Sequence, residues 1–250
     1  MTMSDLIALH GVSKSFSHVT VLDNIDFTLP PSSITGLLGP SGSGKSTLIK
    51  TALGMEKADS GTVSVLDTAM PNRKILGKIG YMAQSDALYE SLTGKENLEI
   101  FGKMIGLHKN ELKNAIAHAA RVVNLTDKLT IQVKNYSGGM KRRLSLGITL
   151  LSNPDLMILD EPTVGIDPHL RRQIWAELTT LRDNGAGLLV TTHVMDEAEL
   201  CDRIALLLNG HIIACDTPAN LKARYNVSTL EDVFLAVDDN TIDDNTAEKN

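Results

Sequence analysis

The chain has 250 residues, 42% of them hydrophobic, and a formal net charge of −6. This length suits one large domain or two small ones, and the hydrophobic content supports a sizeable core and argues against bulk disorder. Seven acids and one lysine lie between Glu231 and Asn250, so the rest of the chain is near neutral, which gives little support to a nucleic-acid partner.

The cysteines and the apolar runs indicate in which cellular compartment the protein is found. Cys201 and Cys215 lie far from any C-x-x-C spacing, which favours a reducing environment without a disulfide framework. The first residues lack a basic segment followed by an apolar one, so no signal peptide is predicted. No apolar run approaches the ~18–20 residues that span a bilayer. We therefore expect a cytoplasmic protein, which remains able to dock on a membrane protein.

Short apolar runs alternate with helix-like stretches, which predicts an α/β fold with a largely parallel sheet. The runs at 6–12 and 20–29 alternate like an antiparallel edge layer. Further runs with strand character are found at 34–38, 62–66, 78–83, 156–159, 187–192 and 203–208. Continuously apolar runs, which are typical of central parallel strands, are 34–38, 156–159, 187–192 and 204–208.

Residues 88–152 differ from this pattern because they are rich in helix formers. We expect them to form a helical subdomain inserted between strands of the sheet. The stretch NGHIIA at 209–214 follows a strand and predicts the turn of a hairpin. The predicted organisation is one domain over residues 1–235, followed by an acidic tail over 236–250 that we expect to be disordered.

The sequence GPSGSGKST matches the phosphate-loop pattern G-x-x-x-x-G-K-[ST], and it lies between a predicted strand and a helix-like stretch. Glycines allow backbone N–H groups to surround phosphates, Lys45 would neutralise β and γ oxygens, and the Ser46 hydroxyl would bind Mg²⁺. The loop residues are Gly39, Pro40, Ser41, Gly42, Ser43, Gly44, Lys45, Ser46 and Thr47. The alternative is a glycine-rich turn between a strand and a helix.

Polar side chains follow three other predicted strands. Gln84 follows the run at 78–83, Asp160 and Glu161 follow 156–159, and His193 follows 187–192. Ligands of open parallel sheets bind beyond the carboxyl ends of the strands. Asp160 fits an acid that holds Mg²⁺ through water, and Glu161 fits a group that orients or deprotonates the attacking water. The alternatives are two acids at a turn, a structural histidine and a commonplace glutamine.

Ser137, Gly138 and Gly139 begin a second predicted helix, with Ser137 as a good N-cap. Helix starts carry free backbone N–H groups and partial positive charge, which suit an anion. One nucleotide needs only one such cradle, and the loop at 39–47 already provides it. The second start therefore predicts contact with a nucleotide on another copy, so that two head-to-tail copies share two ATP molecules.

Five motifs together resemble ATP-binding subunits of ABC transporters over roughly residues 5–235. They are GPSGSGKST, Gln84, YSGGMKRR, LMILDEPTVGIDP and TTH, in the family's order and spacing. The resemblance implies a P-loop NTPase (RecA-like) core with an antiparallel β edge layer and an inserted helical subdomain at about 88–152. It also implies ATP and Mg²⁺ as cofactors.

The resemblance assigns roles to single residues. Phe16 takes the place of the aromatic that stacks on adenine, and Gln84 the place of the residue that senses Mg²⁺ and couples to the membrane subunit. The Mg²⁺ residues would be Ser46, Gln84 and Asp160, and the catalytic residues Glu161, His193 and Lys45. Ser137, Gly138 and Gly139 would contact the γ-phosphate bound to the partner subunit, Asp167 would signal across the dimer, and His193 would act as the γ-phosphate switch.

The chain departs from the family's usual motifs at a few positions. Tyr136 and Met140 stand where Leu and Gln are usual, and Phe16 replaces the more usual Tyr while keeping the π-face. The stretches GGMKRRLSL, TVGIDP and LEDVF resemble ATPase subunits of ABC-2-type exporters. The alternative for LEDVF at 230–234 is a short amphipathic helix that buries Leu230, Val233 and Phe234.

The resemblance implies an ATPase subunit on the inner face of the cell membrane, with a second ATP-binding subunit (a homodimer) and a separately encoded membrane permease as partners. Residues 85–105, with Tyr89 and Phe101, would form part of the docking surface, or else an ordinary helical core. A soluble ABC-type ATPase in DNA repair or translation is the alternative, although sustained heptads are missing and each motif occurs once. A P-loop kinase or GTPase would leave YSGGM unexplained, and no N-K-x-D sequence is present.

Overall fold

The structure is a computed structural model that describes residues 4–237 of the chain. Contacts within the chain divide it into two compact units. The first unit comprises Met1–Arg73 and Thr191–Asn250, and the second comprises Lys74–Val190. The tail for which we expect disorder spans 236–250, and its residues 238–250 lie outside the described part.

An antiparallel sheet forms one layer of the first unit. Burial alternates along its first strand, where Ile7 and Leu9 are fully buried and His10 is exposed. The predicted antiparallel layer is therefore confirmed, and the run at 62–66 joins the same sheet. The strands, in the order β2-β1-β4-β5, are β1 (Ile7–Phe16), β2 (Val19–Leu29), β4 (Ser60–Val65) and β5 (Thr68–Ala69).

The first unit also contains the strand order β10-β9-β3. These strands are β3 (Ser33–Leu38), β9 (Arg203–Leu208) and β10 (His211–Asp216). As predicted from their apolar runs, β3 and β9 are largely buried, and they pair in parallel. The predicted hairpin is also confirmed, since β9 returns as antiparallel β10 through Asn209 and Gly210, whose φ angles of 46° and 80° suit a two-residue turn.

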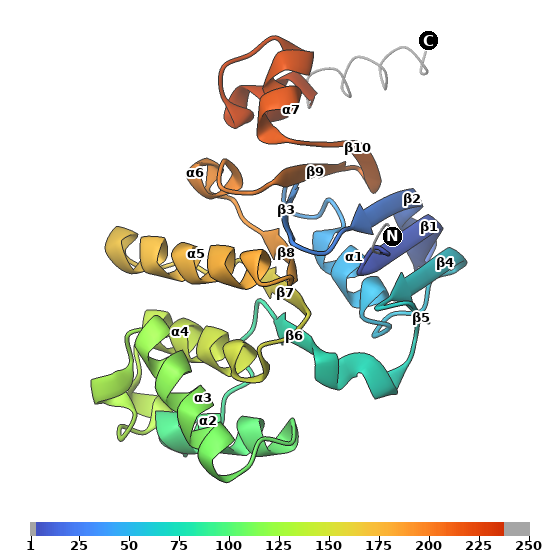
Figure 1. The fold of residues 1–250 in the computed structure, drawn as a ribbon. Helices are drawn as coiled ribbons and strands as arrows, with labels where there is room; N and C mark the ends of the chain where they lie inside the picture. The colour runs from blue at the N-terminus through green and yellow to red at the C-terminus, as the bar shows by residue number, and fades with distance from the viewer. Residues whose placement is uncertain (1–3, 238–250) are drawn as a thin grey trace, which may run out of the picture. The chain divides into compact units, whose positions relative to one another are not determined.

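Helices complete the first unit. They are α1 (Lys45–Ala52), α6 (Met195–Ala198), α7 (Pro218–Tyr225) and a further helical stretch at 230–237. In that last stretch Leu230 and Val233 are buried, as expected for an amphipathic helix, but Phe234 remains partly exposed. Figure 1 shows α1 beside the strands of the antiparallel sheet.

Three strands of the second unit follow the order β8-β7-β6. They are β6 (Ile79–Met82), β7 (Leu156–Asp160) and β8 (Gly187–Thr191). β7 and β8 are buried along their whole length, as expected for central strands. Parallel pairing of Met82 with Leu159 places the carboxyl ends of β6 and β7 at the same edge, so the segments that contain Gln84 and Asp160 emerge next to each other.

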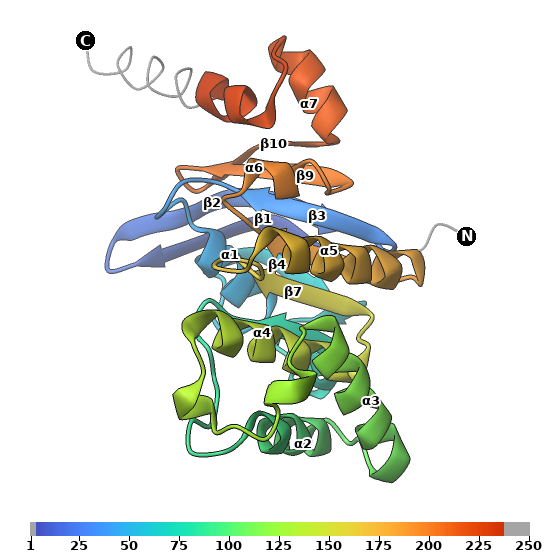
Figure 2. The same ribbon diagram turned by 90° about the vertical axis from the view of Figure 1, so that its left-hand side faces the viewer.

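The helices of the second unit include three that contact one another, α2, α3 and α4, as Figure 2 shows. Leu98, Ile116 and Leu144, one from each helix, are buried. The helices are α2 (Gly94–Met104), α3 (Lys109–Val122), α4 (Gly138–Thr149) and α5 (Pro168–Asp183), with 3₁₀ turns η1 (Arg73–Lys78), η2 (Thr126–Lys128), η3 (Val133–Asn135) and η4 (Leu150–Ser152). Among residues 4–237, no helix has both the length and the apolar character needed to cross a membrane.

Cys201 is buried against the backbone of the first unit. Its side chain is 5% exposed, and its Sγ lies 3.1 Å from the point where a Cβ on Gly36 would sit. Burial, followed by the charges of Asp202 and Glu197, raises the pKa of this thiol to about 12. Burial also raises the pKa of Cys215, which remains half-buried.

We expect iodoacetamide at pH 8 to modify Cys215 before Cys201 in the folded protein. Only about one Cys201 thiol in 10⁴ would be ionised at this pH, and the reagent has almost no access to it. Peptide mass spectrometry after timed alkylation measures both sites, and alkylation in urea is the control in which both should react. Rapid native modification of Cys201 would contradict its position beneath Gly36.

Candidate functional site

The predicted phosphate loop connects β3 to α1 in the first unit. Gly39 is packed so closely that a Cβ would lie 2.2 Å from the Leu207 carbonyl oxygen and 2.6 Å from Ser43 Oγ. Gly42 and Gly44 have φ angles of 84° and 108°, which side chains other than glycine rarely adopt. The loop thus follows a backbone course that depends on its glycines.

The start of α1 suits an anion. This helix has no side-chain cap at Gly44 and no acid in its first turn, so its backbone N–H groups and its positive end are not neutralised locally. Ser43 Oγ is buried without a hydrogen-bond partner in the described part of the chain. These donors and the glycine backbone fit the phosphates of a nucleotide.

Lys45 places its ammonium group over the same loop. Its Nζ donates to the carbonyl oxygen of Gly39 at 2.7 Å and to that of Pro40 at 3.0 Å. The side chain is half-buried, while Ser46 beside it is exposed. A cation and a hydroxyl therefore lie at the start of α1, as the phosphate-loop prediction requires.

Phe16 ends β1 at a two-residue turn in which Ser17 and His18 have φ angles of 46° and 73°. The residue is 41% exposed, and Lys14 Nζ lies 5.0 Å from the ring centroid. This distance is within the range of a cation–π contact. An exposed aromatic ring is compatible with the predicted stacking on a base, which stays a prediction.

His193 follows β8 and belongs to the first unit, where it is exposed. The segment that contains it is held by Thr192, whose Oγ1 donates to Glu197 Oε2 at 2.6 Å and accepts from the Val194 N–H at 3.1 Å. Glu197 is 2% exposed. Sequence analysis missed this buried carboxylate, because a threonine five residues before a glutamate is too common a pattern to single it out.

Asp160 and Glu161 follow one another at the end of β7 in the second unit. Asp160 is only 6% exposed, and Glu161 has a left-handed backbone with a φ of 52°. Burial, and then the Asp160 charge, raise the pKa of nearby Tyr81. The two acids are thus placed in unlike surroundings, one buried and one partly exposed on a strained residue.

Arg142 of α4 brings Gln84 and these acids together. Its Nη1 donates to the Gln84 carbonyl oxygen at 3.1 Å, and its Nη2 donates to the Glu161 carbonyl oxygen at 3.0 Å. Sequence analysis did not select Arg142, because the acceptors are backbone carbonyls and leave no trace in the sequence. The segments after β6 and β7 thus lie side by side.

Ser137 is the N-cap of α4, and its Oγ accepts a hydrogen bond from the Met140 N–H at 3.3 Å. Ser137 and Gly138 are exposed, and a Cβ on Gly138 would meet nothing within 4 Å. Gly139 approaches the Gly165 carbonyl oxygen, which would lie 3.2 Å from its Cβ. The first turn of α4 carries no acid that would offset the partial positive charge of the helix start.

Asp167 caps α5. Its Oδ1 accepts from the Leu170 N–H at 3.0 Å and from the His169 N–H at 3.2 Å. The Leu170 hydrogen bond is the main cause of a lowered pKa at this carboxyl group, and the His169 bond adds to it. The observed role is a helix cap, and the predicted signalling role stays a prediction.

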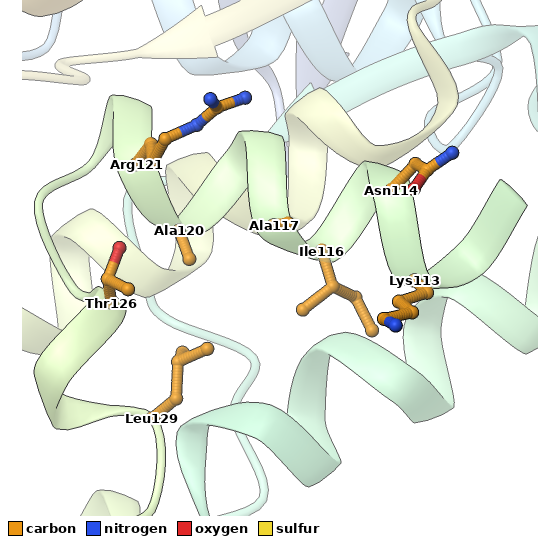
Figure 3. A pocket seen from close by; sticks show the side chains of 8 residues that line it. All are labelled: Lys113, Asn114, Ile116, Ala117, Ala120, Arg121, Thr126 and Leu129. Carbon is orange, nitrogen blue, oxygen red and sulfur yellow. The ribbon is translucent and has the colours of Figure 1, made fainter. Parts of the chain in front are cut away.

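Two of the cavities in the second unit differ in how they relate to the predicted site residues. One of about 530 Å³, shown in Figure 3, contains none of the predicted site residues and is lined by Lys113, Asn114, Ile116, Ala117, Ala120, Arg121, Thr126 and Leu129. The other, of about 190 Å³, lies after β6, and its lining includes Leu88, Phe101 and Ser145.

Residues 4–237 contain no group of three His, Cys, Asp or Glu side chains able to hold a metal.

Comparison with known proteins agrees with this arrangement of motifs. A family model described as ABC transporter matches residues 22–164. The chain is 43% identical over 215 residues to the Nod factor export ATP-binding protein I of Sinorhizobium fredii, covering 85% of this chain and 63% of that relative's length. It is 38% identical to the linearmycin resistance ATP-binding protein LnrL of Bacillus subtilis, covering 90% of this chain and 73% of LnrL. The chain thus spans less than two thirds of the length of the first relative.

Comparison of structures points to the same class. A solved structure of an ATP-binding subunit of an ABC transporter superimposes with a TM-score of 0.86 and 26% identity, covering 92% of this chain and 98% of that one. The expected fold, a P-loop NTPase of mixed α/β type with an antiparallel sheet, parallel strands and helices, is therefore confirmed.

We expect Gly39→Ala to lower the free energy of unfolding by about 3 kcal/mol, because its Cβ would collide with the Leu207 carbonyl, which cannot rotate away. Gly42→Ala is the matched control: its Cβ meets nothing within 4 Å, so only the cost of a left-handed alanine, about 1 kcal/mol, should appear. Urea unfolding without nucleotide measures both values. Equal losses in the two variants would contradict the close packing at Gly39.

Proposed function

Since the chain belongs to the ABC transporter family of ATP-binding proteins, we propose that it binds and hydrolyses ATP to power export through a separate membrane protein. The observation that carries this proposal is the glycine-dependent loop before the uncapped α1, with Lys45 above it. A loop of this kind surrounds phosphates with backbone N–H groups and one cation.

ATP would be held by the whole loop from Gly39 to Thr47, and its adenine would stack on Phe16. Mg²⁺ would be held by Ser46, with Gln84 and Asp160 contributing, and it would supply charge neutralisation to the phosphates. The fit rests on the exposed Ser46 hydroxyl, the buried Asp160 carboxylate and the orphan Ser43 hydroxyl. These donors and acceptors are the kinds that a Mg²⁺ nucleotide requires.

Hydrolysis would depend mainly on position and charge. The Glu161 carboxylate would orient the attacking water and accept its proton, while Lys45 stabilises the charge that develops on the γ-phosphate. His193 would contact the same phosphate, supported by the Thr192–Glu197 hydrogen bond that fixes its segment. Holding the water and phosphate in line removes much of the entropic barrier to attack.

A second copy of the chain would complete each catalytic site. The exposed start of α4, with Ser137, Gly138 and Gly139, offers free N–H groups to a γ-phosphate carried by the other copy. Asp167 would transmit the state of one site to the other. ATP binding would close this head-to-tail dimer, and hydrolysis would reopen it.

The membrane partner would dock near residues 85–105. This stretch contains Tyr89, which is 48% exposed and packs on Phe101 with ring centroids 5.9 Å apart, beside the 190 Å³ cavity. An exposed aromatic residue beside an apolar hollow favours a protein partner. The names of the relatives concern Nod factor export and linearmycin resistance, which favours export over a role in DNA repair or translation. The protein would then act at the inner face of the cell membrane.

We predict that Lys45→Ala weakens ATP binding about 10- to 100-fold, because a charge-assisted contact with phosphate is lost. Isothermal titration with Mg²⁺ and ATP measures the affinity. Lys50→Ala is the control, since Lys50 lies on the same helix outside the loop. Unchanged affinity in Lys45→Ala would refute the phosphate-loop assignment.

We predict that Glu161→Gln stops turnover while ATP binding persists, and that the variant accumulates as an ATP-bound dimer. Adding Ser137→Arg should return this variant to a monomer that still binds ATP, because the added bulk and charge block the helix start. Adding Ser228→Arg instead, at an exposed serine outside the predicted sites, should leave the dimer intact. Light scattering at saturating ATP distinguishes these species, and a monomeric Glu161→Gln protein would count against a shared site.

A further inference from the structure

Arg142 contacts two segments that follow neighbouring strands. It lies on α4, five residues after Ser137, and is only 8% exposed. Toward the segment after β6, its Nη1 donates to the carbonyl oxygens of Ala83 at 2.7 Å and Gln84 at 3.1 Å. Toward the end of β7, Nε and Nη2 donate to the Glu161 carbonyl oxygen at 3.2 and 3.0 Å, and Nη2 also donates to the Asp160 carbonyl oxygen.

Because the guanidinium group is charged and buried, it requires these hydrogen bonds. Its carboxylate neighbour is Asp86, whose Oδ1 lies 3.6 Å from Nη1, so backbone carbonyl dipoles provide most of the direct hydrogen bonds. Asp86 is itself fixed to α4, because Ser145 donates to the same Oδ1 at 2.8 Å. A buried charge is tolerated only while its hydrogen bonds are kept, so the four carbonyl groups and α4 constrain one another.

Glu161 needs such a constraint. Its φ of 52° is a left-handed conformation that costs a residue other than glycine about 1–2 kcal/mol. This backbone conformation sets the direction in which the side chain leaves the end of β7. The guanidinium group holds the carbonyl groups on both sides of the strained residue's Cα atom, those of Asp160 and Glu161.

We propose that Arg142 is a positioning residue for ATP hydrolysis, which fixes the backbone of Glu161 and of Gln84 to the helix that Ser137 begins. The proposal rests on the proposed function, because it concerns the same carboxylate. A planar guanidinium group with five N–H donors reaches both segments at once, which a single ammonium group cannot do. Arg142 thereby ties the catalytic carboxylate to the helix whose start would meet the other copy's nucleotide.

The neighbouring Arg143 offers a matched control. Its Nη1 donates to the carbonyl oxygens of Val123 at 3.3 Å and Asn124 at 3.1 Å, at the end of α3. Arg143 therefore fixes α4 to another helix, and within residues 4–237 it makes no hydrogen bond to the segments of Gln84 or Glu161. Replacing either arginine removes arginine–carbonyl contacts of the same helix, five for Arg142 and two for Arg143, but only Arg142 adjoins the proposed catalytic carboxylate.

The test compares Arg142→Lys with Arg143→Lys in the full chain. We expect Arg142→Lys to lower kcat on the order of 10- to 100-fold, the loss that a misplaced catalytic group causes, while KM and ATP affinity stay close to the parent values. Arg143→Lys should retain nearly parental kcat. A kcat within twofold of the parent for Arg142→Lys, or equal losses in both variants, would overturn the proposal.

Hydrogen–deuterium exchange gives a second readout that does not need activity. In Arg142→Lys, peptides covering 82–88 and 156–166 should exchange faster than in the parent and in Arg143→Lys, because their anchor is weakened. Parental exchange in both peptides would overturn the proposal even if kcat fell. Absence of ATP binding or hydrolysis in the parent would instead refute the proposed function, and the exchange comparison would still decide whether Arg142 fixes these segments. Arg142→Met, which keeps the length and removes the charge, should show at least the same exchange increase.

Discussion

The rest of the structure depends on how backbone N–H groups at helix starts are satisfied. α2 neutralises its own start, because the Thr93 side chain accepts the Glu96 N–H at 3.2 Å and Glu96 Oε2 accepts the Thr93 N–H at 2.7 Å. α1 has neither a side-chain cap nor an acid in its first turn, and α4 has a serine cap but no acid. Both of these starts are led by small residues and carry unneutralised positive ends. Starts of this kind are compatible with negative charge supplied from outside the helix.

Backbone carbonyl groups also fix the positions of the glycine-led loops and of Arg142. Leu207 presents its carbonyl to Gly39, and Gly165 presents its own to Gly139, so each glycine-led loop is confined by main chain from a distant part of the sequence. In the second unit, four carbonyl groups converge on one guanidinium group. Main-chain geometry, more than side-chain identity, therefore determines where the chemically useful groups can lie.

Sequence predicted what depends on periodicity and on local motifs. The antiparallel layer, the buried runs that became β3, β7, β8 and β9, the hairpin at Asn209 and the glycine loop all follow from spacing that can be read along the chain. Arg142 and Glu197 could not be found in this way. Their partners are carbonyl groups and a hydroxyl brought together by folding, and such pairings depend on positions that no short pattern encodes. The amphipathic pattern also predicted burial of Phe234, which is partly exposed. An apolar residue in such a stretch is buried only where a neighbour covers it.

The meeting of β2 with the turn of the β9–β10 hairpin has a consequence for the behaviour of the protein in solution. β2 and β10 each lie at the end of a strand order, and edge strands present unpaired N–H and C=O groups that other chains can use for aggregation. Here the Asp23 N–H of β2 donates to the carbonyl oxygen of Gly210 in the hairpin turn at 2.9 Å, so part of the β2 edge is occupied. The irregular register between β1 and β2 further twists this edge away from a flat template. The first unit thereby limits the surface on which amyloid-like pairing could begin.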